Sequence, residues 1–471
     1  MDIILGAIQY IVDLGATVML PIIIFIIGLC LRQGVAKSLR AGLTVGIGFV
    51  GVNLVITLMT ENLAKAAKAM AENFHLSLNV IDLGWPGTSP MAWASDVGLI
   101  AILIAIAVNV VMLVLKLTRV VNVDIWNVWH FAFTGAIVQM ATGNYVFALI
   151  AIAIHAVFVY KMGDMFTPVS DGYFGLEGIA MPHGDSAWCG VWAAPIDDLI
   201  EKIPGLNKIV ITPETVEKKL GVFGQPMIIG AVLGFIIGLL AGYQPGDALA
   251  LAVQMGGVMV LMPMVVKLIM EGLIPISDAA RELLDKHFSG GDFRIGLDCA
   301  LMLGNPAVVA ISMIFVPLTI LIAAIMPGNR ILPFGDLATI GFFFALAVGV
   351  HKGNIFRTLF SGSFIMVVTI FISNQMMGFQ QMLAKATGLA TGENLISSLD
   401  QAGSPLTYIV TKVFQTDFSL AFFVIAALWF AGFAYTYVKY RRGTLYPGEW
   451  GDLPEDARKG ATPAEASEAA K

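Results

Sequence analysis

The chain has 471 residues, of which 58% are apolar and 13% are charged, and its mean hydropathy is +0.83. Soluble domains are about 45–50% apolar and about 25% charged, so this composition excludes an ordinary soluble enzyme. With 27 basic and 33 acidic residues the formal net charge is -6, which argues against a nucleic-acid partner. Cys30, Cys189 and Cys299 form no CxxC or zinc-type motif, and we predict no metal and no cofactor. The sequence therefore predicts a polytopic membrane protein.

The first predicted elements are apolar segments long enough to be transmembrane helices. A hydrocarbon layer about 30 Å thick requires roughly 20 residues per helix. Segments of this kind occur, in chain order, at 8–31, 41–60, 97–117, 127–142, 145–162, 221–242, 248–270, 307–326, 334–350, 358–378 and 417–438. The segment 127–142 is short and contains polar residues, so the expected number of spans is about 11. The predicted fold class is an all-α polytopic membrane protein.

Lysine and arginine are concentrated on one side of this arrangement. The loop 32–40 carries Arg32, Lys37 and Arg40, and the positive-inside rule places it in the cytoplasm. Alternation of the spans from this loop puts the N-terminus outside and the C-terminus in the cytoplasm. Of the 27 basic residues, this topology leaves only a few outside: Lys65, Lys68, Arg330, Lys385 and Lys412.

The two halves of the chain share a pattern at a fixed offset. Phe25–Leu29 recurs as Phe235–Leu239, and the same offset pairs Gly46 with Gly256 and Gly143-Asn144 with Gly353-Asn354. Each unit contains five spans, and because five is odd, the second unit must be inverted in the bilayer. Inverted repeats are typical of transporters, with a substrate site near the midplane between the repeats. The alternative is that unrelated helices share this spacing by coincidence.

Two segments are too polar to span the bilayer and too apolar for ordinary loops: 167–200 and 380–416. Irregular backbone at membrane depth is tolerated only inside protein or along a watery cavity, so we expect two re-entrant hairpins at a substrate site. The alternative is a pair of surface loops. Residues 201–220 are predicted to form a cytoplasmic amphipathic linker between the halves, and 443–471 a disordered cytoplasmic tail.

Ionisable and amide side chains inside this apolar frame are candidate functional residues, because such groups are costly in lipid. They are His130 and Gln139 in the fourth span, Asn144, His351 and Asn354 at span ends, Glu177, His183 and Asp185 in the first hairpin, and Asp298 and Asn305 before the eighth span. These groups exchange hydrogen bonds with hydroxyls, so the set suits a neutral, hydroxyl-rich ligand. The alternative for Gln139, Asn144 or Asn354 alone is a helix–helix hydrogen bond. We assign His155 to packing.

Three motifs carry a family resemblance. They are Trp85-Pro86-Gly87-Thr88-Ser89-Pro90, the tryptophan-rich stretch Asn122–Gly135, and Gly178–Asp185 with the sequence Gly-Ile-Ala-Met-Pro-His-Gly-Asp. Over roughly residues 1–440, the chain resembles the galactitol-type EIIC. That family supplies the membrane permease subunit of the bacterial phosphoenolpyruvate-dependent sugar phosphotransferase system and belongs to the ascorbate–galactitol superfamily.

The resemblance implies a homodimer in the bacterial inner membrane that works as an elevator, with two inverted five-helix repeats and two re-entrant hairpins. Residues 1–60 and 221–270 would form the scaffold, and 61–200 with 271–416 a mobile core that includes the hairpins. The last span would occupy 417–442. Spans one, two, six and seven are therefore expected to pack on one another.

The resemblance also implies a substrate site contributed by both repeats and the first hairpin. Matched by motif, its residues are Trp85, His130, Gln139, His183, Asn305 and His351; position adds Asp185 and Asn354, and Asp298 is a further candidate. His183 and Asp185 are the groups expected to position the attacking hydroxyl of the substrate or to act as its base.

The function that the resemblance implies is uptake of galactitol or a related polyol, which a separate IIB subunit phosphorylates. That subunit would carry a phosphocysteine charged by IIA. The linker 201–220 and the tail are too short to hold a IIB-like domain, so the chain would take part in phosphoryl transfer only with that partner. Its contribution would be positioning, a large part of phosphoryl-transfer catalysis. The alternative function is an ion-coupled secondary transporter of an unmodified polar solute.

Overall fold

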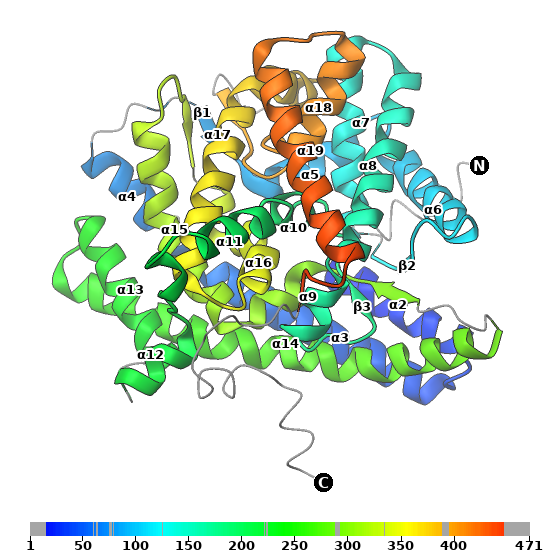
Figure 1. The fold of residues 1–471 in the computed structure, drawn as a ribbon, viewed down its shortest axis with the longest axis horizontal. Helices are drawn as coiled ribbons and strands as arrows, with labels where there is room; N and C mark the ends of the chain where they lie inside the picture. Colours follow the sequence, from blue (N-terminus) through cyan, green and yellow to red (C-terminus); the bar gives the residue numbers. More distant parts are fainter. Residues whose placement is uncertain are drawn as a thin grey trace.

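The structure, a computed structural model, describes residues 16–446 except 60, 63–64, 75–77, 79, 125, 221, 223–224, 288–292, 334 and 389–394. Helices make up most of the described chain, and the strands are short (Figure 1). Residues 8–15 of the first predicted span lie outside the described residues.

Each predicted span overlaps a helix. These helices are α2 (Ala16–Cys30), α3 (Val35–Met59), α6 (Gly98–Val114), α7 (Trp129–Thr142), α8 (Tyr145–Met165), α13 (Pro226–Leu240), α14 (Pro245–His287), α15 (Pro306–Ile325), α16 (Gly341–Val350), α17 (Ile355–Ala386) and α19 (Leu420–Arg441). Within the described residues, α8, α15, α17 and α19 are long and apolar enough to cross a membrane. A fifth span results if Gly87–Ala94 and Gly98–Val114, which bend by 87° at a short break, are taken together.

The other helical segments are shorter and lie between these helices. They are α4 (Lys65–Asn73), α5 (Gly84–Ala94), η2 (Trp126–Val128), α9 (Thr167–Gly172), α10 (Ser186–Gly190), α11 (Ala193–Glu201), η3 (Leu206–Lys208), α12 (Pro213–Leu220), η5 (Cys299–Gly304), η6 (Asp336–Thr339) and α18 (Pro405–Gln415). The predicted linker 201–220 contains η3 and α12 and is largely exposed.

Helices α2, α3, α13 and α14 pack on one another. In Figure 1, α14 runs along the lower edge of the molecule, across the direction of α17 and α19. Helices α3 and α14 approach closely because Gly51 faces Val265, where an added Cβ would lie 2.6 Å from a valine methyl. The largest contacts of this four-helix group with the rest of the described chain are α14 against η5 and α13 against α15.

The all-α prediction omits six short strands, which form two three-stranded parallel sheets. In one sheet, β1 (Val80–Asp82) lies between β5 (Ile331–Leu332) and β6 (Leu395–Ser397). In the other, β4 (Arg294–Gly296) lies between β2 (Val120–Asn122) and β3 (Ile179–Ala180). The central strand of each sheet therefore comes from one half of the chain and both flanking strands from the other.

The reason for these strands is the need to pair backbone groups where helices break. A broken helix inside a membrane leaves N–H and C=O groups that lipid cannot satisfy. Hydropathy windows report only the apolar character of such short segments, so the sequence did not distinguish them from helix ends. The parallel ladders also bring the carboxyl ends of β1 and β6 together, at Asp82 and Ser397.

Within the described residues, the central part of each predicted hairpin segment is buried, and in the second it spans residues 396–411. The first contains α9, β3, α10 and α11, and residues 178–194 are buried. The second is shorter than predicted, because α17 continues to Ala386, past the expected start at 380, before β6 and α18 follow. An apolar helix can extend until a Gly-rich segment ends it, here Thr387-Gly388.

The predicted tail also begins later than expected. Leu445 and Tyr446 are each 5% exposed, and the Tyr446 ring packs against Gly172 of the first hairpin segment. These apolar side chains cover the end of the core, so residues 443–446 are part of the fold. The remainder of the predicted tail, 447–471, lies outside the described residues.

The contact between the two halves at Gly335 provides a test of this arrangement. Gly335 donates a hydrogen bond to the Asp82 carbonyl at 3.0 Å, and an added Cβ would collide with the backbone of Leu83 and Gly84. We expect Gly335→Ala to lower the free energy of unfolding by about 1–3 kcal/mol, since backbone must move to accept the methyl group. Thermal unfolding in detergent, followed by tryptophan fluorescence, measures this.

The matched control is Gly378→Ala in α17, where an added Cβ meets nothing within 4 Å. There the melting temperature should stay the same or rise slightly, because alanine favours helix. Equal destabilisation by the two substitutions would contradict the backbone contact at Gly335.

Candidate functional site

The breaks after β1, β3 and β6 and the start of α7 bring buried polar side chains together. We call this group the central polar cluster: Asp82, His130, His183, Asp185, Asp336, Asp400 and Gln401. Each member is at most 5% exposed. Three of them, His130, His183 and Asp185, are residues that the sequence predicts for the site.

His130 lies in the first turn of α7, stacked on Trp129 with ring centroids 4.0 Å apart. Its Nδ1 lies 2.8 Å from the Asn127 carbonyl, which can only accept a hydrogen bond. Nδ1 of a neutral ring must therefore carry the proton, and Nε2 is an acceptor. Nε2 is buried without a hydrogen-bond partner among the described residues and lies 3.9 Å from Asp400 Oδ1.

His183 has the opposite tautomer. Its Nδ1 accepts from the Ser186 backbone N–H at 3.3 Å, so in the neutral ring Nε2 carries the proton and is a donor. The ring stacks on Phe342 and meets His130 edge-on, with centroids 4.8 Å apart. Gly184 is required beside it, because a Cβ there would lie 2.5 Å from His130. The two imidazoles thus place one acceptor and one donor side by side.

Asp82 and Asp336 bind the backbone at the breaks. Asp82 accepts from the N–H groups of Gly84, Asp336 and Leu399, at 3.0 to 3.2 Å. Asp336 accepts from the N–H groups of Trp85 and Asp400 and from the Ser398 hydroxyl. Such donor sets suit carboxylates and hold three separate chain segments in one geometry.

Asp185 precedes α10 in the first predicted hairpin segment, and Asp400 lies between β6 and α18 in the second. Asp400 accepts from Gln401 Nε2 at 2.8 Å, and Asp185 faces the Cys189 thiol at 3.7 Å. Gln401 Oε1 is a second buried acceptor without a partner among the described residues.

The unpartnered atoms of the cluster, His130 Nε2 and Gln401 Oε1, are acceptors, so a ligand that binds them must offer hydrogen-bond donors. Buried polar atoms are nearly always paired, and an unpaired one indicates a site that a ligand or water completes. Among the described residues, no group of three His, Cys, Asp or Glu side chains could hold a metal ion. Hydroxyl groups suit this arrangement, because each donates one hydrogen bond to a carboxylate or imidazole and accepts another.

Trp85 and Asn305 lie at the ends of helices. Trp85 lies in the first turn of α5, its backbone N–H donates to Asp336 of the cluster at 3.0 Å, and the residue is partly buried. Asn305 caps α15, and its Oδ1 accepts from Ala307 N–H and from the Tyr173 hydroxyl. The structure therefore joins Trp85 to the cluster and places Asn305 in a capping contact with the first hairpin segment.

His351 and Asn354 lie in a second polar group, at the turn between α16 and α17. His351 Nδ1 lies 2.8 Å from Asp197 Oδ1, and Arg357 bonds the same oxygen at 2.9 Å. Burial opposes ionisation of Asp197, but the contacts from His351 and Arg357 outweigh it and lower its pKa to about 2. Asn354 caps α17 and holds the 209–211 segment through its side-chain amide.

The remaining candidates have partners elsewhere. Gln139 donates to Asp96 at 3.1 Å in an exposed contact, and Asn144 caps α8. The Asn127 side chain donates hydrogen bonds to Asp298 and to Asp124. Because the Asn127 carbonyl accepts from His130 Nδ1, Asp298 contacts the residue that orients His130. Glu177 is exposed. None of these side chains bonds a member of the central polar cluster within the described residues.

Sequence reasoning missed Asp82, Asp336, Asp400 and Gln401. A signal was available, because Asp82 and Asp336 stand beside apolar residues and glycine, in Val80–Gly84 and Phe334–Leu337. The rule that an intramembrane carboxylate is costly applies to them as it does to Asp185. Asp82 lies outside the predicted spans, which concealed it because loop carboxylates are usually solvated, whereas Asp336 lies near the start of the predicted span 334–350.

Comparison with known proteins agrees with this architecture. Residues 10–392 match the family model EIIC-GAT, described as the PTS system sugar-specific permease component. The chain is 52% identical over 433 residues to the PTS system galactitol-specific EIIC component of Escherichia coli (strain K12), covering 92% of this chain and 96% of that protein. The protein of the same name from Escherichia coli O157:H7 matches to the same extent. The chain is therefore a multi-pass membrane protein that belongs to the EIIC-GAT family of phosphotransferase-system sugar permeases.

Proposed function

We propose that this chain is a galactitol permease subunit, which binds the hexitol in the central polar cluster and presents it to a phosphorylated IIB protein. Support comes from the identity of 52% to galactitol-specific EIIC components and from the chemistry of the cluster. The protein would act as an enzyme only together with IIB, since the described chain contributes binding and positioning groups.

The observation that carries this proposal is the pair of facing acceptors at His130 and Asp400. His130 Nε2 and Asp400 Oδ1 lie 3.9 Å apart, and neither can donate to the other when the carboxyl group is ionised. Neighbouring hydroxyls of a hexitol can donate one hydrogen bond to each atom. The His183 Nε2–H can in turn donate to a hydroxyl oxygen. A site of this kind rejects ligands without hydroxyls, because its own polar atoms would stay unpaired.

In the proposed reaction, a terminal hydroxyl oxygen of the hexitol attacks the phosphorus of the IIB phosphocysteine. The O–P bond forms, the S–P bond breaks, and the thiolate leaves with the electron pair. The hydroxyl proton must pass to a base, and His130 Nε2 is an acceptor poised for this role. The sequence favoured His183 and Asp185 for it; the hydrogen bond from Ser186 makes neutral His183 a donor instead, which suits positioning.

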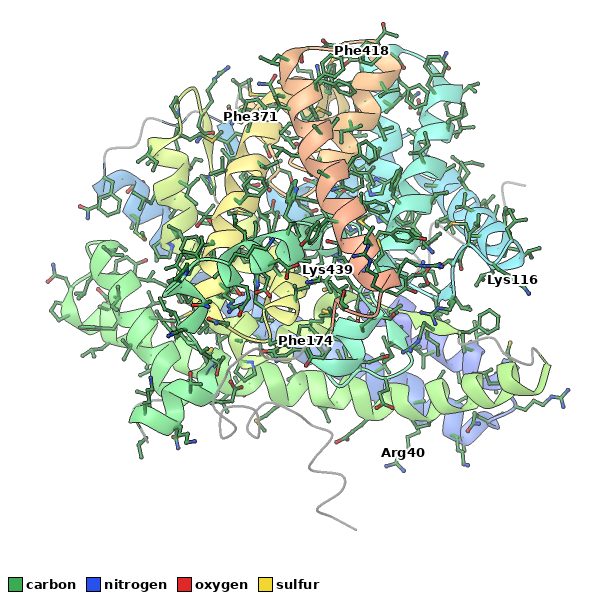
Figure 2. The ribbon with its side chains drawn as sticks, in the orientation of Figure 1. Arg40, Lys116, Phe174, Phe371, Phe418 and Lys439 are labelled. Carbon is green, nitrogen blue, oxygen red and sulfur yellow. The ribbon has the colours of Figure 1, made fainter. Side chains whose placement is uncertain are left out.

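The wider architecture that we propose has two inverted repeats, a scaffold and a mobile core. The packing of α2, α3, α13 and α14 on one another supports the scaffold, and the reciprocal strand exchange supports the repeats. For the orientation, Figure 2 has Arg40 at the lower edge of the molecule, Lys439 near mid-height and Phe418 at the upper edge, which supports a cytoplasmic side below. A homodimer in the bacterial inner membrane, with elevator motion, completes the proposal.

Vectorial phosphorylation provides the first test. Proteoliposomes that enclose phosphorylated IIB and meet labelled galactitol outside should accumulate labelled galactitol phosphate, and vesicles that enclose IIB with its cysteine replaced by serine should not. Accumulation of free galactitol driven by an ion gradient, without any IIB, would establish the secondary-transporter alternative instead. Thin-layer separation of the vesicle contents distinguishes the two products.

The second test removes the acceptor on His130. The variant His130→Phe keeps the ring stack on Trp129 but has no Nε2, so a substrate hydroxyl loses its partner. We expect the affinity for galactitol to fall about 10- to 100-fold, measured by isothermal titration on purified protein.

His155→Phe is the matched control, because His155 is also fully buried but has Thr134 of α7 as its hydrogen-bond partner. That substitution should change the melting temperature and leave the affinity for galactitol within about twofold, since it removes no atom of the cluster. Equal loss of affinity in the two variants would refute a direct role for His130.

A further inference from the structure

The three strands of the sheet with β4 at its centre end at one edge. They are parallel, so their carboxyl ends lie side by side. Asp124 stands two residues beyond β2, Asp298 two residues beyond β4, and His183 three residues beyond β3. The pairing continues past the strands, since the Val123 N–H donates to the Gly296 carbonyl at 3.1 Å. Because β2 and β3 belong to the first half of the chain and β4 to the second, this edge joins the two halves.

The Asn127 side chain connects the segments that follow β2 and β4. Its amide nitrogen Nδ2 donates to Asp124 Oδ2 at 2.5 Å and to Asp298 Oδ2 at 3.0 Å. An amide nitrogen has two hydrogens, so each carboxyl group receives one of them. The other oxygen of Asp298 accepts from the Ala300 N–H at 2.8 Å, which holds that carboxyl group in place. Asn127 is only 6% exposed, so a lost donor there is costly to replace.

The backbone carbonyl of the same residue selects the tautomer of His130. It lies 2.8 Å from Nδ1, which therefore carries the proton in the neutral ring and leaves Nε2 as the acceptor 3.9 Å from Asp400 Oδ1. The ring contacts with Trp129 and His183 hold the plane of the imidazole. Ring contacts do not distinguish the two tautomers, so the choice falls to the Asn127 carbonyl.

The turn that carries this carbonyl depends on side chains for its position. Asn127 lies in η2, a 3₁₀ segment of three residues, and such short segments have weak internal hydrogen bonds. Val128, the N-cap of α7, provides no side-chain hydrogen bond. The bonds from Asn127 to Asp124 and Asp298, together with its backbone N–H to Asp124 Oδ1 at 3.3 Å, therefore hold the turn.

We propose that Asn127 is a positioning residue for His130. It ties the turn before α7 to one carboxyl group from each half of the chain, and so presents His130 Nε2 to the substrate as a hydrogen-bond acceptor. The acceptor is then in place only when the two halves are packed together. This inference rests on the proposed function for the role of Nε2, and it adds the residues that fix the tautomer.

The tautomer of His130 is the first measurement, by nitrogen NMR on protein with isotopically labelled histidine, in nanodiscs without ligand. Wild-type His130 should carry its proton on Nδ1, and the His130→Phe variant identifies the signal by its absence. Asn127→Asp has nearly the same shape but no amide hydrogen, so we expect a mixture of tautomers or a shift to Nε2–H. An unchanged Nδ1–H signal in this variant, or a wild-type ring protonated on Nε2, would overturn the inference.

Where Asn127→Asp does not fold, Asp298→Ala serves as the second variant. It leaves the bond to Asp124 but removes the acceptor from the second half of the chain. The fraction of His130 with the proton on Nδ1 should fall, because the turn is then held from one half only. An unchanged fraction would show that the second half has no part in the tautomer.

The matched control is Asn109→Asp. Asn109 is also 6% exposed, and its amide donates to the Val120 carbonyl at 2.9 Å, at the start of β2. Loss of this donor should lower the melting temperature, because it loosens the same strand. His130 should keep its proton on Nδ1, since the Asn109 bonds reach β2 and not the η2 turn. An equal change of tautomer in the control would reduce the effect to general loosening and refute the inference.

Binding of galactitol shows whether Asn127 acts through His130. Asn127→Asp alone, or Asp298→Ala in its place, should weaken binding about tenfold in isothermal titration. In a His130→Phe background the same substitution should change the affinity by less than about twofold, since the acceptor that it positions is already absent. A tenfold loss in both backgrounds would mean an independent effect and contradict the proposal.

The two kinds of measurement separate this inference from the proposed function. Absence of galactitol binding and of IIB-dependent phosphorylation in the wild type would refute the proposed function, and the NMR measurement would still test the tautomer without any ligand. Galactitol binding together with a tautomer that does not respond to Asn127 or Asp298 would refute only the inference. A changed tautomer with a loss of affinity that requires His130 supports both.

Discussion

The structure depends on one constraint: backbone N–H and C=O groups exposed by a break in a membrane helix must be paired within the protein. Two parallel three-stranded sheets meet this requirement, with β1 between β5 and β6, and β4 between β2 and β3. Because each central strand and its neighbours come from opposite halves of the chain, neither half can pair its own breaks. The two halves are therefore interdependent, and the close backbone approach of Gly335 to Leu83 and Gly84 follows from this exchange.

The same constraint accounts for the position of the polar cluster. Where helices break, backbone N–H groups lose their helical partners. Asp82 and Asp336 together accept six hydrogen bonds, mostly from backbone N–H groups at those breaks. Asp82 and Asp336 therefore hold the backbone beside Asp185 and Asp400, whose carboxylates accept fewer hydrogen bonds. Carboxylates that hold the backbone and carboxylates with fewer partners thus share one region, the interior where the breaks meet. The donors that hold Asp82 and Asp336 also fix the backbone on which the site is built.

A second polar group, with Asp197, His351 and Arg357, stabilises the α16–α17 turn and the end of the first hairpin segment. It differs from the central cluster in carrying a cation, Arg357, whose contact favours the ionised form of the partly exposed Asp197 carboxylate. The core therefore contains two polar regions of different character. One is acidic and incomplete without a hydrogen-bond donor, and the other is paired and basic at its edge.

The sequence by itself determined the helical membrane character, the helices that overlap the predicted spans and the family, because hydropathy and motifs are local properties. It also identified His130, His183 and Asp185, since polar side chains in an apolar setting are costly. The tertiary structure alone decided the strand pairing, the four residues missed in the cluster, and the partners of Gln139, Asn305 and His351. The physical reason is distance along the chain: Asp82 meets Asp336 and Leu399 only after both halves have folded together.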